Sequence, residues 1–219
     1  MQKQLNVKKL TAATNVAAVD VCRLLDENGV QFCPIDIADW EKDYPYKPDV
    51  KFRIAHSGDR IFIEYNVEED SVRAVAQSDN GRVWEDSCCE FFVSPSSDNT
   101  YYNIETNCSG KVLIEHGAGR GNREHAPLDT VATVERWSSL GSEPFDEKQG
   151  RTAWKMCLVI PVSALFRDNI KSLDGTKMTA NFYKCGDKQS KPHFLSWNKI
   201  ETENPDFHRP EYFGKLSFE

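Results

Sequence analysis

Apolar and polar residues alternate through most of the chain after residue 50, and this pattern predicts β-strands. Residues 60–67 show it most clearly, because apolar side chains at every second position, from Ile61 to Val67, share one side of the segment. The turn residues 57–59 join this run to an apolar run at 52–56, so the two predict a β-hairpin. Similar runs predict further strands at 71–77, 88–93, 101–106, 111–115, 131–135, 154–161, 179–185, 193–197 and 214–218.

The order of these runs predicts the fold class. About eleven short strands follow one another with turn residues between them, and they lack the alternating helices of a parallel sheet. A helical period occurs at 16–28, where Gly29 supplies a stop, and one helical turn is expected at 162–168. We therefore predict an all-β fold, an antiparallel β-sandwich of the jelly-roll-like kind, with a short N-terminal helix.

The 219 residues are expected to form a single domain. An all-β sandwich of this size is routinely one domain, and no repeat, low-complexity tract or linker divides the chain. Residues 1–34 are interpreted as an N-terminal extension that packs on the sandwich. The segments 117–128 and 138–150 are interpreted as long polar connections.

Charge and cysteine usage narrow the classes of partner. Lys and Arg number 27 against 34 Asp and Glu, which gives a net charge of −7. Such an acidic chain lacks the basic surface that binds nucleic acid or anionic membranes. The seven cysteines form no CxxC motif and are expected to be packed, reduced thiols, with Cys88 and Cys89 on opposite faces of one strand. The first 15 residues lack the apolar region of a signal peptide, so the protein is expected to be cytoplasmic or exported with its leader removed.

Polar side chains repeat on one side of two predicted strands. Glu90 shares a side with Cys88, and Asn103 and Glu105 share a side with Tyr101. Such a row faces either solvent or a ligand. A glycosidase needs two carboxyls about 5–10 Å apart across a sugar ring, and the sequence does not set that distance.

Two tryptophans stand at strand ends beside polar residues. Trp84 precedes the predicted strand at 88–93, and Trp197 follows the strand at 193–197. Sugar rings stack their C–H faces on such aromatic rings and bond their hydroxyls to nearby polar groups. Core packing and sugar stacking are equally good interpretations of this pair, whereas Trp154 opens an apolar run and is assigned to the core.

Several segments together resemble the family 9-like carbohydrate-binding domains, which are sometimes labelled endo-xylanase-like proteins. The segments are WEDSCCEFFVSP at 84–95, YYNIETNCSGKVL at 101–113, IPVSAL at 160–165, NFYKCGD at 181–187, HFLSW at 193–197 and PDFHRPEYFG at 205–214. The resemblance spans roughly residues 35–219 and implies a β-sandwich that binds glycans. Some members hold structural calcium, but no dense Asp/Asn loop demands it here, so no metal or cofactor is expected.

The resemblance also implies a site. Family members sandwich a terminal sugar at the reducing end between two tryptophans, which correspond by position to Trp84 and Trp197, and Glu90 corresponds to a sugar-bonding carboxylate. The family's arginine on the next strand is missing, and Asn103 or Glu105 is expected in its place, a departure that puts the reducing-end preference in doubt. The remaining candidate ligand-binding residues lie in the similar C-terminal segments: Tyr183, Lys184 and His193.

These observations lead to one function and two alternatives. We expect a non-catalytic module that binds a plant-type or related glycan, such as a xylan or glucan oligosaccharide, by tryptophan stacking. The first alternative is an endo-xylanase-like glycoside hydrolase that uses a carboxylate pair. The second is a haem-binding electron-transfer sandwich, which has only Met156 and Met178 as internal methionine ligands and is disfavoured because Met156 lies in a core strand.

Overall fold

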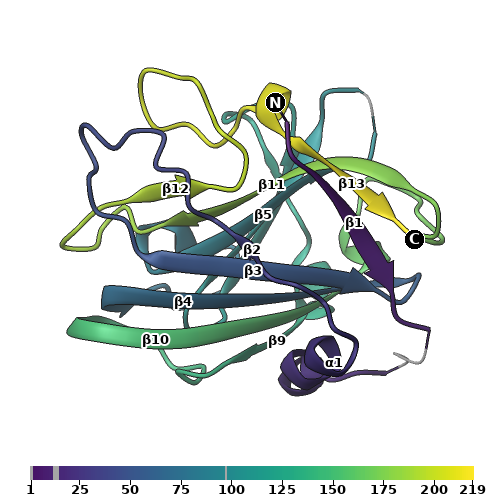
Figure 1. The fold of residues 1–219 in the computed structure, drawn as a ribbon, viewed down its shortest axis with the longest axis horizontal. Helices are drawn as coiled ribbons and strands as arrows, with labels where there is room; N and C mark the ends of the chain where they lie inside the picture. The colour runs from purple at the N-terminus through teal and green to yellow at the C-terminus, as the bar shows by residue number, and fades with distance from the viewer. Residues whose placement is uncertain (1, 12–14, 97) are drawn as a thin grey trace.

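The computed structural model of the protein describes residues 2–11, 15–96 and 98–219, and these residues form a curled β-sheet with short helices at its edges (Figure 1). The strands are β1 (Gln4–Lys9), β2 (Cys33–Pro34), β3 (Asp49–His56), β4 (Arg60–Ala74), β5 (Cys88–Ser94), β6 (Tyr101–Asn107), β7 (Val112–Gly117), β8 (Glu124–His125), β9 (Glu135–Ser138), β10 (Phe145–Pro161), β11 (Lys177–Cys185), β12 (Phe194–Ser196) and β13 (Gly214–Phe218). The α-helices are α1 (Val21–Glu27) and α2 (Leu128–Ala132), and the 3-10 turns are η1 (Ala18–Asp20), η2 (Val83–Glu85), η3 (Val162–Ala164) and η4 (Pro210–Tyr212).

The strand order divides the sheet into two halves that meet at β1. The first half runs β8-β7-β6-β5-β11-β13, and the second runs β3-β4-β10-β9. Residues 4–7 of β1 pair with β13, and Lys8 and Lys9 pair with β3, both in parallel. The neighbouring strands within each half run antiparallel, as predicted.

The main core lies between the two halves. Phe52 of β3 stacks on Phe182 of β11 with ring centroids 3.6 Å apart, and Phe91 of β5 stacks on the same ring at 4.9 Å. These contacts join strands from opposite halves, and Figure 1 shows β3, β4 and β10 lying across β5 and β11. The predicted all-β, sandwich-like fold class with a short N-terminal helix is therefore confirmed.

Each half also buries its outer face. Helix α1 covers the second half, where Leu25 packs with Phe62 of β4, and Arg53 donates from Nη1 to Asp26 (2.6 Å) and from Nε to the buried Glu64 (2.6 Å). The outer face of the first half is covered by the loops at 35–48 and 197–213, whose side chains form a second apolar cluster with β5, β6, β7 and β11. This arrangement leaves the first half covered on both faces, and its outer face carries the candidate site.

Some elements differ from the sequence prediction. Strand β4 runs through residues 60–74 as one element, because the charged run at its middle includes Glu69, which is buried and accepts a hydrogen bond from Trp154 Nε1 (2.7 Å). The predicted strand at 131–135 is instead the end of helix α2, which buries Val131, followed by a turn that buries Val134 and by the start of β9. Strand β1 was not predicted at all, although it joins the two halves. Across the described part of the chain, no helix has the length and apolar character needed to cross a membrane.

Candidate functional site

A cleft of about 270 Å³ opens on the outer face of the first half. Strands supply its floor. Its walls come from η2, the first residue of β12 and the loops after β7, β11 and β12. The floor residues are Glu90, Glu105, Leu113, Glu115 and Cys185, and the wall residues are Trp84, Arg120, Asp187, Phe194, Pro205, Asp206, Phe207 and His208.

Strand pairing brings the floor carboxyls together. Glu90 of β5 and Glu105 of β6 are direct partners in the antiparallel ladder, so their side chains leave the sheet on the same side. Their side chains are only 3% and 4% exposed. Two buried acids therefore face one cleft from adjacent strands.

An amide holds the floor carboxyls in position. Asn103 Nδ2 donates to Glu105 Oε1 at 2.9 Å and to Glu115 Oε2 at 2.8 Å. Arg123 Nε in turn donates to Asn103 Oδ1 at 2.9 Å, which fixes the orientation of the amide. The other Glu105 oxygen, Oε2, is buried without a hydrogen-bond partner among the described residues. Buried polar atoms are usually paired, so this oxygen is an open hydrogen-bonding position on the cleft floor.

Burial sets the protonation of these acids. It raises the pKa of Glu105 to about 8, and it raises the pKa of Glu90 well above its usual value, with a further contribution from the neighbouring Glu105. Burial also raises the pKa of Asp187 to about 6. Near neutral pH, Glu105 therefore carries a proton for most of the time and can donate a hydrogen bond as well as accept one.

Aromatic side chains form the apolar part of the walls. Trp84 of η2 is half-buried, and its carbonyl oxygen accepts a hydrogen bond from the Asp187 N–H (3.2 Å). Phe207 stacks on Tyr183 with centroids 4.1 Å apart and planes at 5°. The Tyr183 hydroxyl donates to the Phe207 carbonyl at 3.1 Å, which ties the loop to β11. Aromatic surface and hydrogen-bonding groups thus line the same cleft.

The basic side chains near the cleft differ in charge. His208 Nδ1 lies 2.8 Å from the Tyr101 hydroxyl, and burial lowers the pKa of His208 to about 3, so this ring is neutral. Arg123 lies with its guanidinium 4.3 Å from the Tyr101 ring centre, behind the floor. Arg120 is exposed and lines the mouth of the cleft.

The structure brings together five of the eight residues predicted for the site. Trp84, Glu90 and Glu105 line the cleft. Asn103 lies behind them and orients Glu105, and Tyr183 is fully buried beneath Phe207.

The other three predicted residues lie elsewhere. Trp197 is 3% exposed in the core between the halves, with its ring edge-on to Phe52 and Phe182. It therefore offers no face to a ligand, and the expected pair of stacking tryptophans is not formed. Lys184 and His193 are fully buried on the inner face, where Lys184 Nζ lies 3.0 Å from Glu69 Oε2 and 2.7 Å from His193 Nε2. This group joins β11 to β4 across the core and takes no part in the cleft.

The residues that the prediction missed come mainly from loops. Asp187 and the segment 205–208 belong to stretches that resemble the carbohydrate-binding family, and that resemblance was the available signal. Glu115 lies two residues after Leu113 in the same strand, so strand alternation places both side chains on one face. That pattern could have identified Glu115 as a floor residue. Arg120 lies in a glycine-rich loop and carried no signal.

Comparison with known proteins shows the family. The model of carbohydrate-binding family 9 matches residues 19–218, a range that starts before the expected 35–219 and includes α1. The chain belongs to carbohydrate-binding family 9. It is 54% identical to a candidate carbohydrate-binding protein from Bacteroides uniformis ATCC 8492, with all of both chains covered and a TM-score of 0.97. The predicted family resemblance is thus confirmed.

More distant solved structures share the family 9 fold. A family 9 module from Caldicellulosiruptor kristjanssonii in complex with glucose is 13% identical over 99% of this chain and 96% of its own, with a TM-score of 0.61. A structure of a family 9 module from the same organism with cellotriose is also 13% identical, over 99% of this chain and 94% of its own, with a TM-score of 0.62. None of the curated proteins matches this sequence.

Proposed function

We propose that the protein is a non-catalytic carbohydrate-binding module that holds an oligosaccharide in the cleft between η2 and β5–β7. Membership of carbohydrate-binding family 9 supports a glycan ligand. The distant family 9 structures were solved with glucose and cellotriose, which favours a glucan or xylan chain as the first ligand to test here.

One observation carries the proposal: the cleft joins a half-buried indole to a floor of buried carboxyls. A pyranose ring has an apolar C–H face and a rim of hydroxyls, so it requires these two kinds of surface side by side. Trp84 supplies the flat surface, and Phe194 and Phe207 extend it. Glu90 and the unpartnered Glu105 Oε2 provide the hydrogen-bonding groups for the hydroxyls.

The paired carboxyls also bear on the hydrolase alternative. A glycosidase needs one carboxyl to be ionised while its partner donates a proton. Burial raises the pKa of both Glu90 and Glu105, so the pair is better suited to hydrogen bonding than to nucleophilic attack. We therefore propose binding without bond cleavage.

Calorimetric titration with xylo-, cello- and manno-oligosaccharides tests this function. We expect saturable heat with one series and no release of reducing sugar on prolonged incubation with the same sugars. Repeating the titration with the corresponding alditols shows whether the reducing end enters the cleft. No heat with any series would refute glycan binding of this class. Release of reducing sugar that disappears in Glu90→Gln would establish the hydrolase instead.

A further inference from the structure

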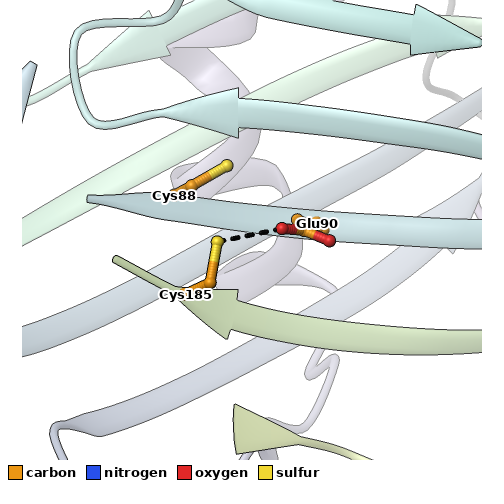
Figure 2. A group of neighbouring side chains, drawn as sticks. All are labelled: Cys88, Glu90 and Cys185. Carbon is orange, nitrogen blue, oxygen red and sulfur yellow. Dashed lines mark hydrogen bonds between the residues drawn. The ribbon is translucent and has the colours of Figure 1, made fainter. Parts of the chain in front are cut away.

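Two thiols and a carboxyl meet at the inner end of the cleft, where β5 and β11 pair (Figure 2). The ligand atoms of Cys88, Glu90 and Cys185 all lie within 4.8 Å of one another. Figure 2 shows the Cys185 sulfur directed at the Glu90 carboxyl, to which it donates a hydrogen bond of 3.0 Å. The three side chains are 0%, 3% and 1% exposed, so this is a buried and preformed group.

Strand geometry fixes the grouping. Cys88 and Cys185 are direct partners in the antiparallel β5–β11 ladder, so they leave the sheet on the same side. Glu90 lies two residues after Cys88 and therefore shares that side. Cys89 points the other way and packs in the core between the halves.

We propose that Cys88, Cys185 and Glu90 form a binding site for a thiophilic divalent metal ion of the zinc class, with one coordination position open toward the cleft. Thiolates and carboxylates are common protein ligands of zinc. A zinc ion held by three protein ligands keeps a fourth coordination position for water or a bound ligand. Glu90 and Cys185 both line the cleft, so the free position faces solvent or a bound ligand.

The spacing of the ligand atoms suits such an ion. With Zn–S distances of about 2.3 Å and tetrahedral angles, two sulfurs lie about 3.8 Å apart. The observed atoms lie within 4.8 Å of one another, so shifts of about 1 Å or less bring them to that geometry. Small changes of the two cysteine rotamers on fixed strands are sufficient for this.

Within the described part of the chain, a metal ion would meet no competing basic side chain at Glu90. Glu90 faces Glu105, whose Oε2 is buried and unpartnered, and no salt bridge reaches either acid within the described ranges. Lys184, the nearest buried cation on β11, bonds Glu69 and His193 on the inner face. A divalent ion on the outer face would therefore replace the proton on Glu90 without displacing an existing ion pair.

Burial of the thiols does not prevent binding. It raises the pKa of Cys88 to about 12, so the free thiol stays protonated near neutral pH. A coordinating metal removes that proton, because the ion stabilises the thiolate far more than burial destabilises it. Up to three protons, from the two thiols and the Glu90 carboxyl, are then released to solvent for each ion bound.

Cobalt(II) titration of the reduced, chelator-treated full chain tests the site. Thiolate ligation gives a sulfur-to-cobalt charge-transfer band in the near ultraviolet, and zinc should displace the cobalt and abolish the band. We expect saturation at one ion per chain. Since loss of an outer-shell partner alone costs about 10–100-fold in metal affinity, loss of either thiolate ligand should weaken binding by at least about 100-fold.

The variants Cys88→Ala and Cys185→Ala test the location, and Cys89→Ala is the matched control, because it removes an equally buried thiol on the opposite face of β5. Glu90→Gln keeps both thiols and the packing volume, and it should weaken cobalt binding at least about tenfold. It therefore keeps the proposal testable if an alanine variant fails to fold.

Absence of the band in the wild-type chain at millimolar cobalt would overturn the proposal. So would a band that survives in both Cys88→Ala and Cys185→Ala, or cobalt affinity unchanged by Glu90→Gln. The metal site goes beyond the proposed function, since cobalt binding is measured without sugar. Sugar binding is measured on the metal-free chain, so failure of one proposal is distinguishable from failure of the other.

Discussion

The raised pKa of Glu105 predicts that the wild-type protein loses stability as the pH rises. This carboxyl is 4% exposed, and burial raises its pKa to about 8 from a usual value of 4.5. Between these two pH values the folded chain holds a proton that the unfolded chain has released, so folding stability falls with increasing pH. At about 1.4 kcal/mol for each pH unit, the loss from pH 4.5 to pH 8 is about 5 kcal/mol.

Glu105→Gln removes this titration while preserving the side-chain shape. The amide oxygen can still accept the hydrogen bond from Asn103, so the local geometry should persist. Relative to an exposed-site control, we expect the variant to match wild type at acid pH, where both side chains are neutral, and to be the more stable protein near pH 8 and above. Glu143→Gln is that control, because Glu143 is exposed.

Urea unfolding followed by circular dichroism from pH 5 to pH 9, in the presence of chelator, measures the free energy of unfolding for the three proteins. The difference between Glu105→Gln and wild type isolates the Glu105 titration, because the other groups titrate in both chains. The two stability profiles should diverge as the pH rises, with Glu105→Gln the more stable protein at the alkaline end. Parallel profiles across this range would refute the assignment of a raised pKa to Glu105.

Three further predictions concern the scaffold. Lys184→Met should destabilise the fold by about 3–5 kcal/mol in urea unfolding, because it leaves the buried Glu69 without its cation; stability equal to wild type would contradict this. Trp197→Ala should cost about 3–5 kcal/mol by the same assay but leave the sugar affinity of the folded chain unchanged, because the ring lies in the core; weakened sugar binding would return Trp197 to the site. Deletion of residues 2–9 should abolish the cooperative thermal transition, because β1 joins both halves and we propose that it is integral to a single domain; a wild-type melting curve would show that it is dispensable.

Strand alternation predicted the site side chains that lie on one face of the sheet. Glu90, Asn103 and Glu105 were placed on common sides of their strands from sequence, and the structure puts all three at or just behind the cleft floor. Alternation alone does not say which side faces the main core. Strands β5 and β6 are buried on both faces throughout, so the row of polar side chains does not mark a solvent-exposed side.

Trp197 illustrates this limit. It stands beside polar residues in the sequence, yet it packs in the core between the halves. Side chains from the loop after β12 cover the outer face. Lys184 was assigned to the ligand because it lies in a segment that resembles the family. Its partner Glu69 lies more than a hundred residues away in sequence, and the curl of the sheet brings the two together. Such long-range pairing has no local pattern that could predict it.

A comparison of two tryptophan variants tests whether the sugar binds in the cleft. Trp84→Ala removes the half-buried indole from the cleft wall, and Trp137→Ala removes another half-buried indole from β9 in the other half of the sheet. Calorimetry with the best-bound oligosaccharide should show that Trp84→Ala loses about 2 kcal/mol of binding energy, or about 30-fold in affinity, while Trp137→Ala binds as wild type does. Equal affinity in wild type and Trp84→Ala would place the sugar outside this cleft and refute the proposed site.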